Sequence, residues 1–452
     1  MNNRPDSALH ACRSFSRSFM RSTLLLSLTV VVSACVVNPV TGDREVQFYD
    51  TQWELTTGNS LYAPMRQQQG GDFVADPELQ AYVQSIGQHL AQRARRKDEL
   101  DFEFHVINNS TPNAWALPGG KIAINRGLLT ELKSEAELAA VLGHEIVHAD
   151  ASHSAQQQSK ATLTRVGAIA SMVLLGSQAD SSAGRAAAVM VPALGAQLLS
   201  QKYSRDAERE ADDYGMRYMS ESGFDPNGAI QLQETFVELS KDRRQDWLSG
   251  FFASHPPSQE RVQRNRETAQ SLPSGGIIGE DRYQQKLAYL RELEPAYAAY
   301  DSARELVVKK DLGGARTKLD KALAITPDEA LFQVLDGDLK QQAGQLEQAY
   351  AAYDLAMELN PGYFLPHLRR GRLNYEQGNT PAAATDLRNS LERLPTALAH
   401  YLLGNIERDA GQTDRAVAHY TQAASSDSDV GRAAQREDRK STRLNSSHLV
   451  IS

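Results

Sequence analysis

Two mainly apolar runs stand out from the mixed pattern of the chain. The first, Leu24 to Val32, follows a basic residue, Arg21, and leads into small residues before Cys35. This is the pattern of a bacterial signal peptide. The second run extends from Val166 to Gly176. Both runs are far shorter than the roughly 20 apolar residues that cross a bilayer. We predict a signal peptide over residues 1–34, a buried helix at the second run and no membrane span in the mature protein.

A helical period governs the segment from Ser134 to His148. Ser134 and Glu137 have the spacing of a capping box, which begins a helix. The apolar residues that follow fall on one stripe of that helix: Leu138, Leu142, Ile146 and Ala149. The segment is therefore predicted to be a helix that buries one face.

A period of 33 or 34 residues runs through the C-terminal third of the chain. It is marked by residues that recur at fixed sites: Pro327, Pro361 and Pro395; Gly337, Gly371 and Gly404; Ala315, Ala349, Ala383 and Ala416. This period resembles the tetratricopeptide repeat, in which small residues let paired helices approach closely. We expect an α-solenoid here, with its function on the concave surface as a whole.

The repeats imply a boundary in the preceding segment. Residues 268–284 contain Pro273, Gly275, Gly276 and Gly279 and are predicted to form a linker. From the N-terminus, we predict a signal peptide (1–34), a tether (35–60), a first folded domain (61–275), the repeat domain (276–435) and a tail (436–452). The tail shares no period with the repeats and resembles translated sequencing-adapter sequence, so we expect it to be an artefact.

Composition narrows the function classes. A chain of 452 residues exceeds the size of one hydrophobic core, which favours two domains. The net charge of −8 and the absence of a run of Lys and Arg argue against nucleic-acid binding. Both cysteines, Cys12 and Cys35, lie near the N-terminus, so the body of the protein has no sequence basis for a disulfide or a thiolate metal site.

Candidate chemistry lies on the helix predicted after Ser134. His144 and His148 are four residues apart, so their imidazoles project from the same face and can share one metal ion. Glu145 is turned by about 100° around the helix, which places a carboxylate beside that metal. Alone, this H-E-x-x-H pattern also fits histidines with ordinary core or surface roles.

A second segment, Ser204 to Asp212 (SRDAEREAD), strengthens the metal interpretation. Glu208 and Asp212 lie four residues apart on one face of another predicted helix. Two histidines and one carboxylate leave one tetrahedral position of zinc open for water, as in catalytic rather than structural zinc sites. Glu145 would act as the general base on that water. Asp212 would orient one of the two histidines.

Together, the segments HEIVH and SRDAEREAD resemble the family of zinc metallopeptidases that includes HtpX and BepA. Asn113 to Leu129 is similar to the family's strand region before the H-E-x-x-H helix, and Ser254 to Ser258 (SHPPS) with Arg261 resembles its S-H-P-P motif. The resemblance covers residues 38–266, and the repeats after it suggest BepA-like architecture. It implies a mainly α protein: an α+β, zincin-like metallopeptidase domain at 61–275, followed by an α-solenoid of tetratricopeptide repeats.

The resemblance also implies residue roles. One Zn²⁺ per chain would be held by His144, His148 and Glu208. The family pattern favours Glu208 over Glu210, because its ligand lies four positions before the Asp of the A-D pair. Lys121 to Ile124 would form the exposed strand edge to which an extended, unfolded substrate adds; the alternative is a purely internal role in the sheet.

His255, in the S-H-P-P segment, admits three roles. In BepA-like members this histidine can reach the zinc and hold the enzyme latent. It could instead stabilise the oxyanion of the intermediate, or it could be a structural turn residue beside two prolines. We favour the gate. His153 is expected at the surface, and the residues between His148 and Glu208 could form a lid over the site.

Val32 to Cys35 resembles a lipobox, in which Cys35 would be acylated and become the mature N-terminus. An ordinary signal peptide or a short anchor is the alternative. Val36, in place of an Asp, favours the periplasmic side of the outer membrane in a Gram-negative bacterium. The lipobox departs from BepA-like members, and the lack of membrane-spanning segments departs from HtpX-like members.

These observations predict a lipid-anchored zinc metalloendopeptidase that serves protein quality control at the outer membrane. Its substrates would be unfolded or misassembled envelope proteins, and its repeats would dock on outer-membrane assembly machinery or hold clients. The rival prediction, from a different class, is a non-proteolytic periplasmic chaperone or scaffold with a latent zinc site. The two differ in whether Glu145 is required.

Overall fold

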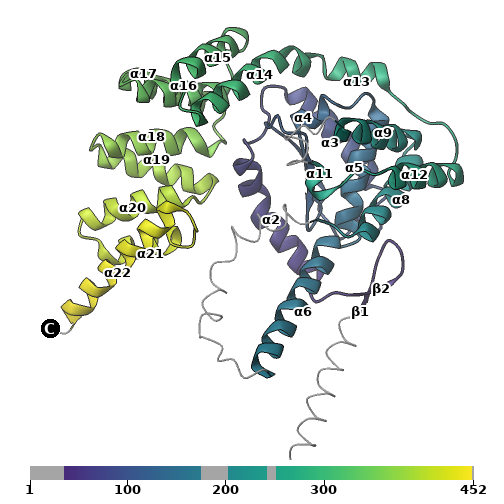
Figure 1. The fold of residues 1–452 in the computed structure, drawn as a ribbon, viewed down its shortest axis with the longest axis horizontal. Helices are drawn as coiled ribbons and strands as arrows, with labels where there is room; N and C mark the ends of the chain where they lie inside the picture. The colour runs from purple at the N-terminus through teal and green to yellow at the C-terminus, as the bar shows by residue number, and fades with distance from the viewer. Residues whose placement is uncertain (1–34, 175–201, 242–250, 450–452) are drawn as a thin grey trace, which may run out of the picture.

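The structure is a computed structural model that describes residues 35–174, 202–241 and 251–449. The predicted signal peptide, the end of the second apolar run and the middle of the predicted lid lie outside these residues. Figure 1 shows a mixed N-terminal body, residues 35–287, beside a row of paired helices, the repeat domain of residues 288–449. The protein is therefore mainly α, with two small sheets in the N-terminal body, as predicted.

The two sheets differ in their place along the chain. β1 (Cys35–Val37) and β2 (Arg44–Val46) form an antiparallel hairpin within the predicted tether. The second sheet contains β3 (Glu103–Ile107), β4 (Ala114–Leu117) and β5 (Lys121–Asn125) in the order β3-β5-β4. β3 runs parallel to β5, and β4 runs antiparallel to it.

The prediction that Lys121 to Ile124 form an exposed strand edge is wrong. These residues lie on β5, which pairs with a strand on each side and is buried throughout. Even Lys121 is buried, because its ammonium group reaches the carboxylates of Asp101 and Glu103. No local pattern in the sequence indicates that β3, which precedes the β4–β5 hairpin, pairs with the other side of β5. The edge strands of this sheet are β3 and β4.

The helices of the N-terminal body surround the second sheet. They are α2 (Thr51–Gln68), α3 (Pro77–Ala91), α4 (Arg126–Leu129), α5 (Glu135–Asp150), α6 (His153–Leu174), α8 (Arg205–Glu221), α9 (Asn227–Lys241), α11 (Phe251–Ser254), α12 (Gln259–Ser271) and α13 (Glu280–Lys286). Among the residues that the structure describes, none of these helices, nor those of the repeats, is long and apolar enough to cross a membrane.

α5 is the central helix of the N-terminal body. Ser134 caps it by accepting a hydrogen bond from the backbone of Glu137. The Glu137 carboxylate reaches back to the backbone N–H of Lys133, one residue before the N–H that a capping box uses. The helix is buried on all sides rather than on the single predicted face, because α3, α8 and α9 all pack against it. α5 crosses α8 at Gly143 and Gly215, where a Cβ on Gly143 would lie 3.1 Å from the Gly215 carbonyl oxygen.

The predicted linker packs against the N-terminal body. After α12, the carbonyls of Ile277 and Ile278 accept hydrogen bonds from the backbone of Asp225 and Ala136. In α13, Tyr283 is fully buried and its hydroxyl donates to the carbonyl of Leu129. The chain therefore leaves the N-terminal body only after α13.

The repeat domain consists of helix pairs followed by a last helix. The helices are α14 (Ala288–Val308), α15 (Leu312–Ile325), α16 (Ala330–Gln342), α17 (Leu346–Leu359), α18 (Phe364–Glu376), α19 (Thr380–Arg393), α20 (Ala397–Asp409), α21 (Thr413–Ala423) and α22 (Asp429–Leu449). The repeated glycines lie where paired helices touch: a Cβ on Gly337 would lie 2.4 Å from the Tyr353 ring. α22 includes most of the predicted tail, and residues 450–452 lie outside the described residues.

The first repeats contact the N-terminal body directly. Asn108, which follows β3, donates to the Glu329 carboxylate at 3.1 Å, and the Arg126 guanidinium lies 3.4 Å from the centroid of the Tyr297 ring. The Tyr297 ring also lies beside Phe73, and a single hydrophobic cluster extends through both parts of the protein. The repeat domain and the N-terminal body therefore share a buried interface.

Candidate metal centre

Two adjacent turns of α5 and the first turn of α8 form the centre of the site. His144 and His148 project together from α5, with their Nε2 atoms 3.0 Å apart. Glu208 enters from α8, which Ser204 caps, and its carboxylate oxygens lie 3.6 Å from His144 Nε2 and 3.5 Å from His148 Nε2. All three side chains are buried. The structure thus brings together the three side chains predicted as metal ligands.

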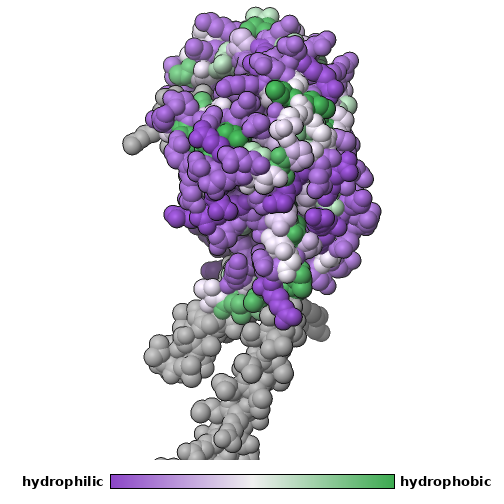
Figure 2. Space-filling view, turned by 90° about the vertical axis from the view of Figure 1, so that its right-hand side faces the viewer, coloured by the Kyte–Doolittle hydropathy of each residue, from purple (hydrophilic) through white to green (hydrophobic). Residues whose placement is uncertain are grey.

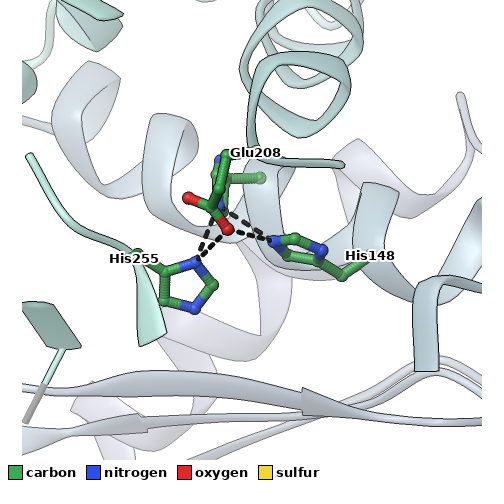
Figure 3. A group of neighbouring side chains, drawn as sticks. His148, Glu208 and His255 are labelled. Carbon is green, nitrogen blue, oxygen red and sulfur yellow. Dashed lines mark hydrogen bonds and ion pairs between the residues drawn. The ribbon is translucent and has the colours of Figure 1, made fainter. Parts of the chain in front are cut away.

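His255 is the fourth member of this cluster. It follows α11, at the turn before α12, and is 1% exposed. Its Nδ1 atom lies 2.9 Å from Glu208 Oε1 and 3.2 Å from His144 Nε2 (Figure 3). One ligand atom from each of the four side chains lies within 4.8 Å of every other. His255 thus offers a fourth donor atom beside the three predicted ligands, and it would compete with water as a ligand of a bound metal.

The donor set fits a zinc ion. Imidazole nitrogens and a carboxylate are ordinary zinc ligands, and four of them make a tetrahedral set. Burial raises the pKa of the Glu208 carboxyl, but the neighbouring His255, His148 and His144 outweigh it and hold that pKa well below its ordinary value, which favours the charged carboxylate that binds metals. Burial also holds the pKa of His148 well below its ordinary value, which favours the neutral imidazole that binds metals. His144, His148 and Glu208 are therefore able to hold a metal, with His255 as a fourth donor.

Glu145 lies beside this cluster on α5. Its carboxylate is completely buried, and within the described part of the chain neither oxygen has a hydrogen-bond partner. Glu145 Oε1 lies 3.5 Å from His255 Nε2. Burial raises the pKa of the Glu145 carboxyl, against the opposing effect of His255 and His144. A carboxylate with a raised pKa is suited to accept a proton near neutral pH.

Asp212 orients His144, one of the two histidines for which the sequence predicted this role. Asp212 Oδ1 lies 3.0 Å from His144 Nδ1, on the side of the ring away from the cluster. Arg261, from α12, donates two hydrogen bonds of 2.7 Å to the Asp212 carboxylate and lies 3.0 Å from Glu208 Oε2. Burial raises the pKa of Asp212, but Arg261 outweighs it and lowers the pKa below its ordinary value.

Two residues near His148 were not predicted as parts of the site. The prediction that His153 is a surface residue is wrong: it is 3% exposed, and its Nδ1 atom lies 2.8 Å from His148 Nδ1. The turn between α5 and α6 folds it back onto the ligand. Tyr203, just before the cap of α8, stacks on the His148 ring with centroids 3.9 Å apart. An aromatic residue directly before the SRDAEREAD motif was the only available signal for this stacking.

Comparisons with known proteins agree with this geometry. The model of peptidase family M48 matches residues 77–269, which include all four clustered side chains, and a tetratricopeptide repeat model matches residues 397–430. The beta-barrel assembly-enhancing protease of Escherichia coli K12 is 28% identical over 414 residues, covering 82% of this chain and 81% of that protein.

Other relatives match a shorter part. A putative beta-barrel assembly-enhancing protease of Vibrio cholerae is 31% identical over 226 residues, 49% of this chain and 45% of that protein. The mitochondrial metalloendopeptidase OMA1 of Schizosaccharomyces pombe is 37% identical over 169 residues, 37% of this chain and 47% of that protein. The chain thus spans less than half the length of these two relatives. It carries a domain of peptidase family M48 followed by tetratricopeptide repeats, and it is similar to metalloproteases.

Proposed function

We propose that this protein is a zinc-dependent endopeptidase that cleaves misfolded or stalled envelope proteins at the periplasmic face of the outer membrane. The observation that carries the proposal is the buried group of His144, His148 and Glu208, beside which lies the carboxylate of Glu145, which accepts no hydrogen bond from the described residues. The relatives named as assembly-enhancing proteases support the choice of client class.

The three predicted ligands would hold the zinc, and each residue around them has a separate task. Zinc, when bound, supplies a Lewis acid that lowers the pKa of water toward about 7. Glu145 takes the proton of the attacking water on a carboxylate oxygen and passes it to the leaving amide nitrogen. Asp212 keeps the His144 ring oriented, and Arg261 holds Asp212 and Glu208 in place.

His255 acts as a gate in this proposal. Its Nδ1 atom lies among the ligand atoms, where water has to enter before hydrolysis. With zinc held by the other three side chains, the His255 imidazole would compete with water as the fourth ligand. Removal of the imidazole in His255→Ala is expected to raise proteolysis, whereas a role at the oxyanion predicts a loss.

The substrate would bind in extended form along β4, whose four residues are buried in this structure, so whatever covers this strand has to move aside first. This strand forms the edge of the sheet that lies beside β5, and it packs against α5, which carries both ligand histidines. An extended chain that adds to an edge strand is held by backbone hydrogen bonds, so few side chains are specified. This arrangement favours unfolded segments over folded proteins. The repeats would hold such clients or dock on assembly machinery, since tetratricopeptide repeats present extended binding surfaces.

A lipid on Cys35 would place the enzyme at the membrane. Cys35 begins β1, and the neighbouring Val36 and Val37 are both exposed. Figure 2 shows a mainly hydrophilic surface on which apolar residues form several small groups, one of them at the lower end. A single acyl chain and a small apolar surface together favour attachment to a bilayer.

The decisive test compares the purified protein with Glu145→Gln. Zinc content and casein cleavage are measured for both. Glu145→Gln should retain about one zinc per chain and lose cleavage by at least about 100-fold, because the general base is absent. A chelator should abolish cleavage by the parent protein, and added zinc should restore it.

The same pair separates the endopeptidase from the chaperone alternative. The position of His255 within the cluster favours a latent state. Absence of casein cleavage by the parent protein therefore does not distinguish the two functions. The pair is then repeated in the His255→Ala background. If zinc is bound and cleavage is still absent, the endopeptidase proposal fails in favour of a chaperone or scaffold.

A further inference from the structure

The far side of His148 carries a buried polar chain that the proposed mechanism does not use. His148 Nδ1 lies 2.8 Å from His153 Nδ1, and His153 Nε2 lies 3.6 Å from Glu210 Oε2. Glu210 Oε1 accepts a hydrogen bond of 2.9 Å from Asn38 Nδ2. His153 and Asn38 are each 3% exposed. The chain therefore runs from a proposed metal ligand to the hairpin of β1 and β2.

The proton positions along this chain follow from the role of His148. Its Nε2 atom faces the cluster, so a neutral ring that offers Nε2 to a metal carries its hydrogen on Nδ1. That hydrogen needs an acceptor, and His153 Nδ1 is within hydrogen-bond distance. His153 then carries its own hydrogen on Nε2, which faces the Glu210 carboxylate. His148 Nδ1 thus has a hydrogen-bond acceptor, whereas His153 Nε2 has no hydrogen-bond partner among the described residues and meets Glu210 only at ion-pair distance, 3.6 Å.

The turn between α5 and α6 holds His153 in this place. Ser152 has a φ of 58°, in the left-handed region that residues other than glycine rarely adopt. Its hydroxyl accepts a hydrogen bond of 2.6 Å from buried Arg96, which also pairs with Glu54. Such a backbone conformation persists only when the surroundings fix it. The turn is therefore built to return His153 to the ligand.

α8 consequently reaches the cluster through three acidic residues. Glu208 is itself a proposed ligand, and Asp212 contacts His144 directly. Glu210 serves His148 indirectly, through His153. The spacing of these acids in SRDAEREAD thus supplies one ligand and orients both histidines.

We propose that His153 is a positioning residue for the metal site, which fixes the ring and tautomer of His148 and is itself oriented by Glu210 and Asn38. This inference rests on the proposed metal ligation by His148. Groups that hold the remote nitrogen of a metal-bound histidine are worth about 10- to 100-fold in metal affinity.

The test measures zinc affinity by competition with a chromophoric chelator in the purified protein. His153→Phe keeps the ring volume but removes the acceptor, so zinc affinity should fall by about 10- to 100-fold. His153→Asn is the matched control, because its side-chain oxygen can take the place of Nδ1. It should stay within a few-fold of the parent protein. Glu210→Gln, which keeps a polar contact for Asn38, should weaken zinc binding less than His153→Phe.

The outcomes are distinguishable. If His153→Phe binds zinc as tightly as the parent protein, the positioning role is overturned. If His153→Asn loses as much affinity as His153→Phe, a role through hydrogen bonding is overturned. If His153→Phe does not fold, Glu210→Gln decides the question by the same measurement. A parent protein that binds no zinc would overturn the proposed function, and this inference with it, whereas equal affinities would overturn the inference alone.

Discussion

At the scale of single residues, Arg261 contacts two acidic residues of the site, although it is not one of the four clustered side chains. It is buried, it forms two hydrogen bonds with Asp212, and it contacts Glu208. Arg261→Met would leave the Asp212 carboxylate buried without its counter-charge. Loss of one partner of a buried pair costs about 3–5 kcal/mol. We expect the free energy of unfolding, measured in urea, to fall by about this amount.

Arg209→Met is the control for that measurement. Arg209 pairs with Glu260 between the same two helices, but both side chains are solvent-exposed. Exposed ion pairs contribute little to stability, so this variant should unfold like the parent protein. Equal effects of the two substitutions would show that Arg261 has no special role.

His367 gives a pH-dependent prediction. It is buried in α18, and among the described residues neither ring nitrogen has a hydrogen-bond partner. Burial lowers the pKa of His367 from 6.5 to about 4. Between these values the unfolded state binds the proton and the folded state does not, so stability is full above pH 6.5 and falls as the pH drops toward 4.

His367→Leu should remove this part of the pH dependence. The slope of unfolding free energy against pH between 4 and 6.5 should decrease by up to about 1.4 kcal/mol per pH unit. Urea unfolding at several pH values measures it. Parallel curves for the two proteins would contradict the assignment.

Sequence spacing predicted the residues whose relation is local. His144 and His148 are one helical turn apart, as are Glu208 and Asp212, so their shared faces follow from the helix period alone. His153 could not be placed in the same way. Its approach to His148 depends on the left-handed backbone of Ser152, for which no residue in the sequence is diagnostic.

At the scale of elements, the site depends on how closely α5 and α8 cross. A Cβ on Gly215 would lie 3.0 Å from the backbone nitrogen of His144, which is tighter than ordinary contact. Gly215→Ala should therefore push α8 away and separate Glu208 and Asp212 from His144. Small misplacements of catalytic groups are costly, so we expect casein cleavage to fall by roughly tenfold or more, with weaker zinc binding.

Gly313→Ala is the matched control for the helix crossing. Gly313 lies in α15, and a Cβ there would meet only a side-chain oxygen at 4.0 Å. The same added methyl group should leave cleavage and zinc binding unchanged. Normal activity in Gly215→Ala would show that the crossing tolerates expansion.

The elements themselves were more predictable than their arrangement. The capping-box spacing before α5 and the repeat period identify helices from neighbouring residues, and both predictions agree with the structure. The order of strands in the sheet depends on residues far apart in the sequence, because β3 pairs with β5 although β4 lies between them in the chain. This is why β5 was wrongly assigned as the edge.

At the scale of the whole molecule, the shared interface predicts that the N-terminal body and the first repeats unfold together. Tyr297 is its central residue: it packs under Arg126 and beside Phe73, and its hydroxyl donates to Glu329. Tyr297→Ala should reduce the unfolding free energy by about 3–5 kcal/mol, as for other large buried aromatics.

Scanning calorimetry can detect the coupling. The parent protein should show one main transition for the N-terminal body and the first repeats, and Tyr297→Ala should lower or split it. Tyr289→Ala, on the same helix but 45% exposed, should change stability by no more than about 0.5 kcal/mol. Two separate transitions in the parent protein would rule out a shared unfolding unit.

The hairpin of β1 and β2 has a consequence for how far the enzyme can work from a bilayer. Asn38 is held by Glu210 of α8, and it lies only three residues after Cys35. An extended chain covers about 3.5 Å per residue, so an acyl group on Cys35 would begin within roughly 10 Å of that contact. The predicted tether would then add almost no length between the membrane and the folded protein. The distance from the membrane at which such an enzyme can cut is limited by the size of its folded part. Clients therefore have to come to the membrane surface to be cut.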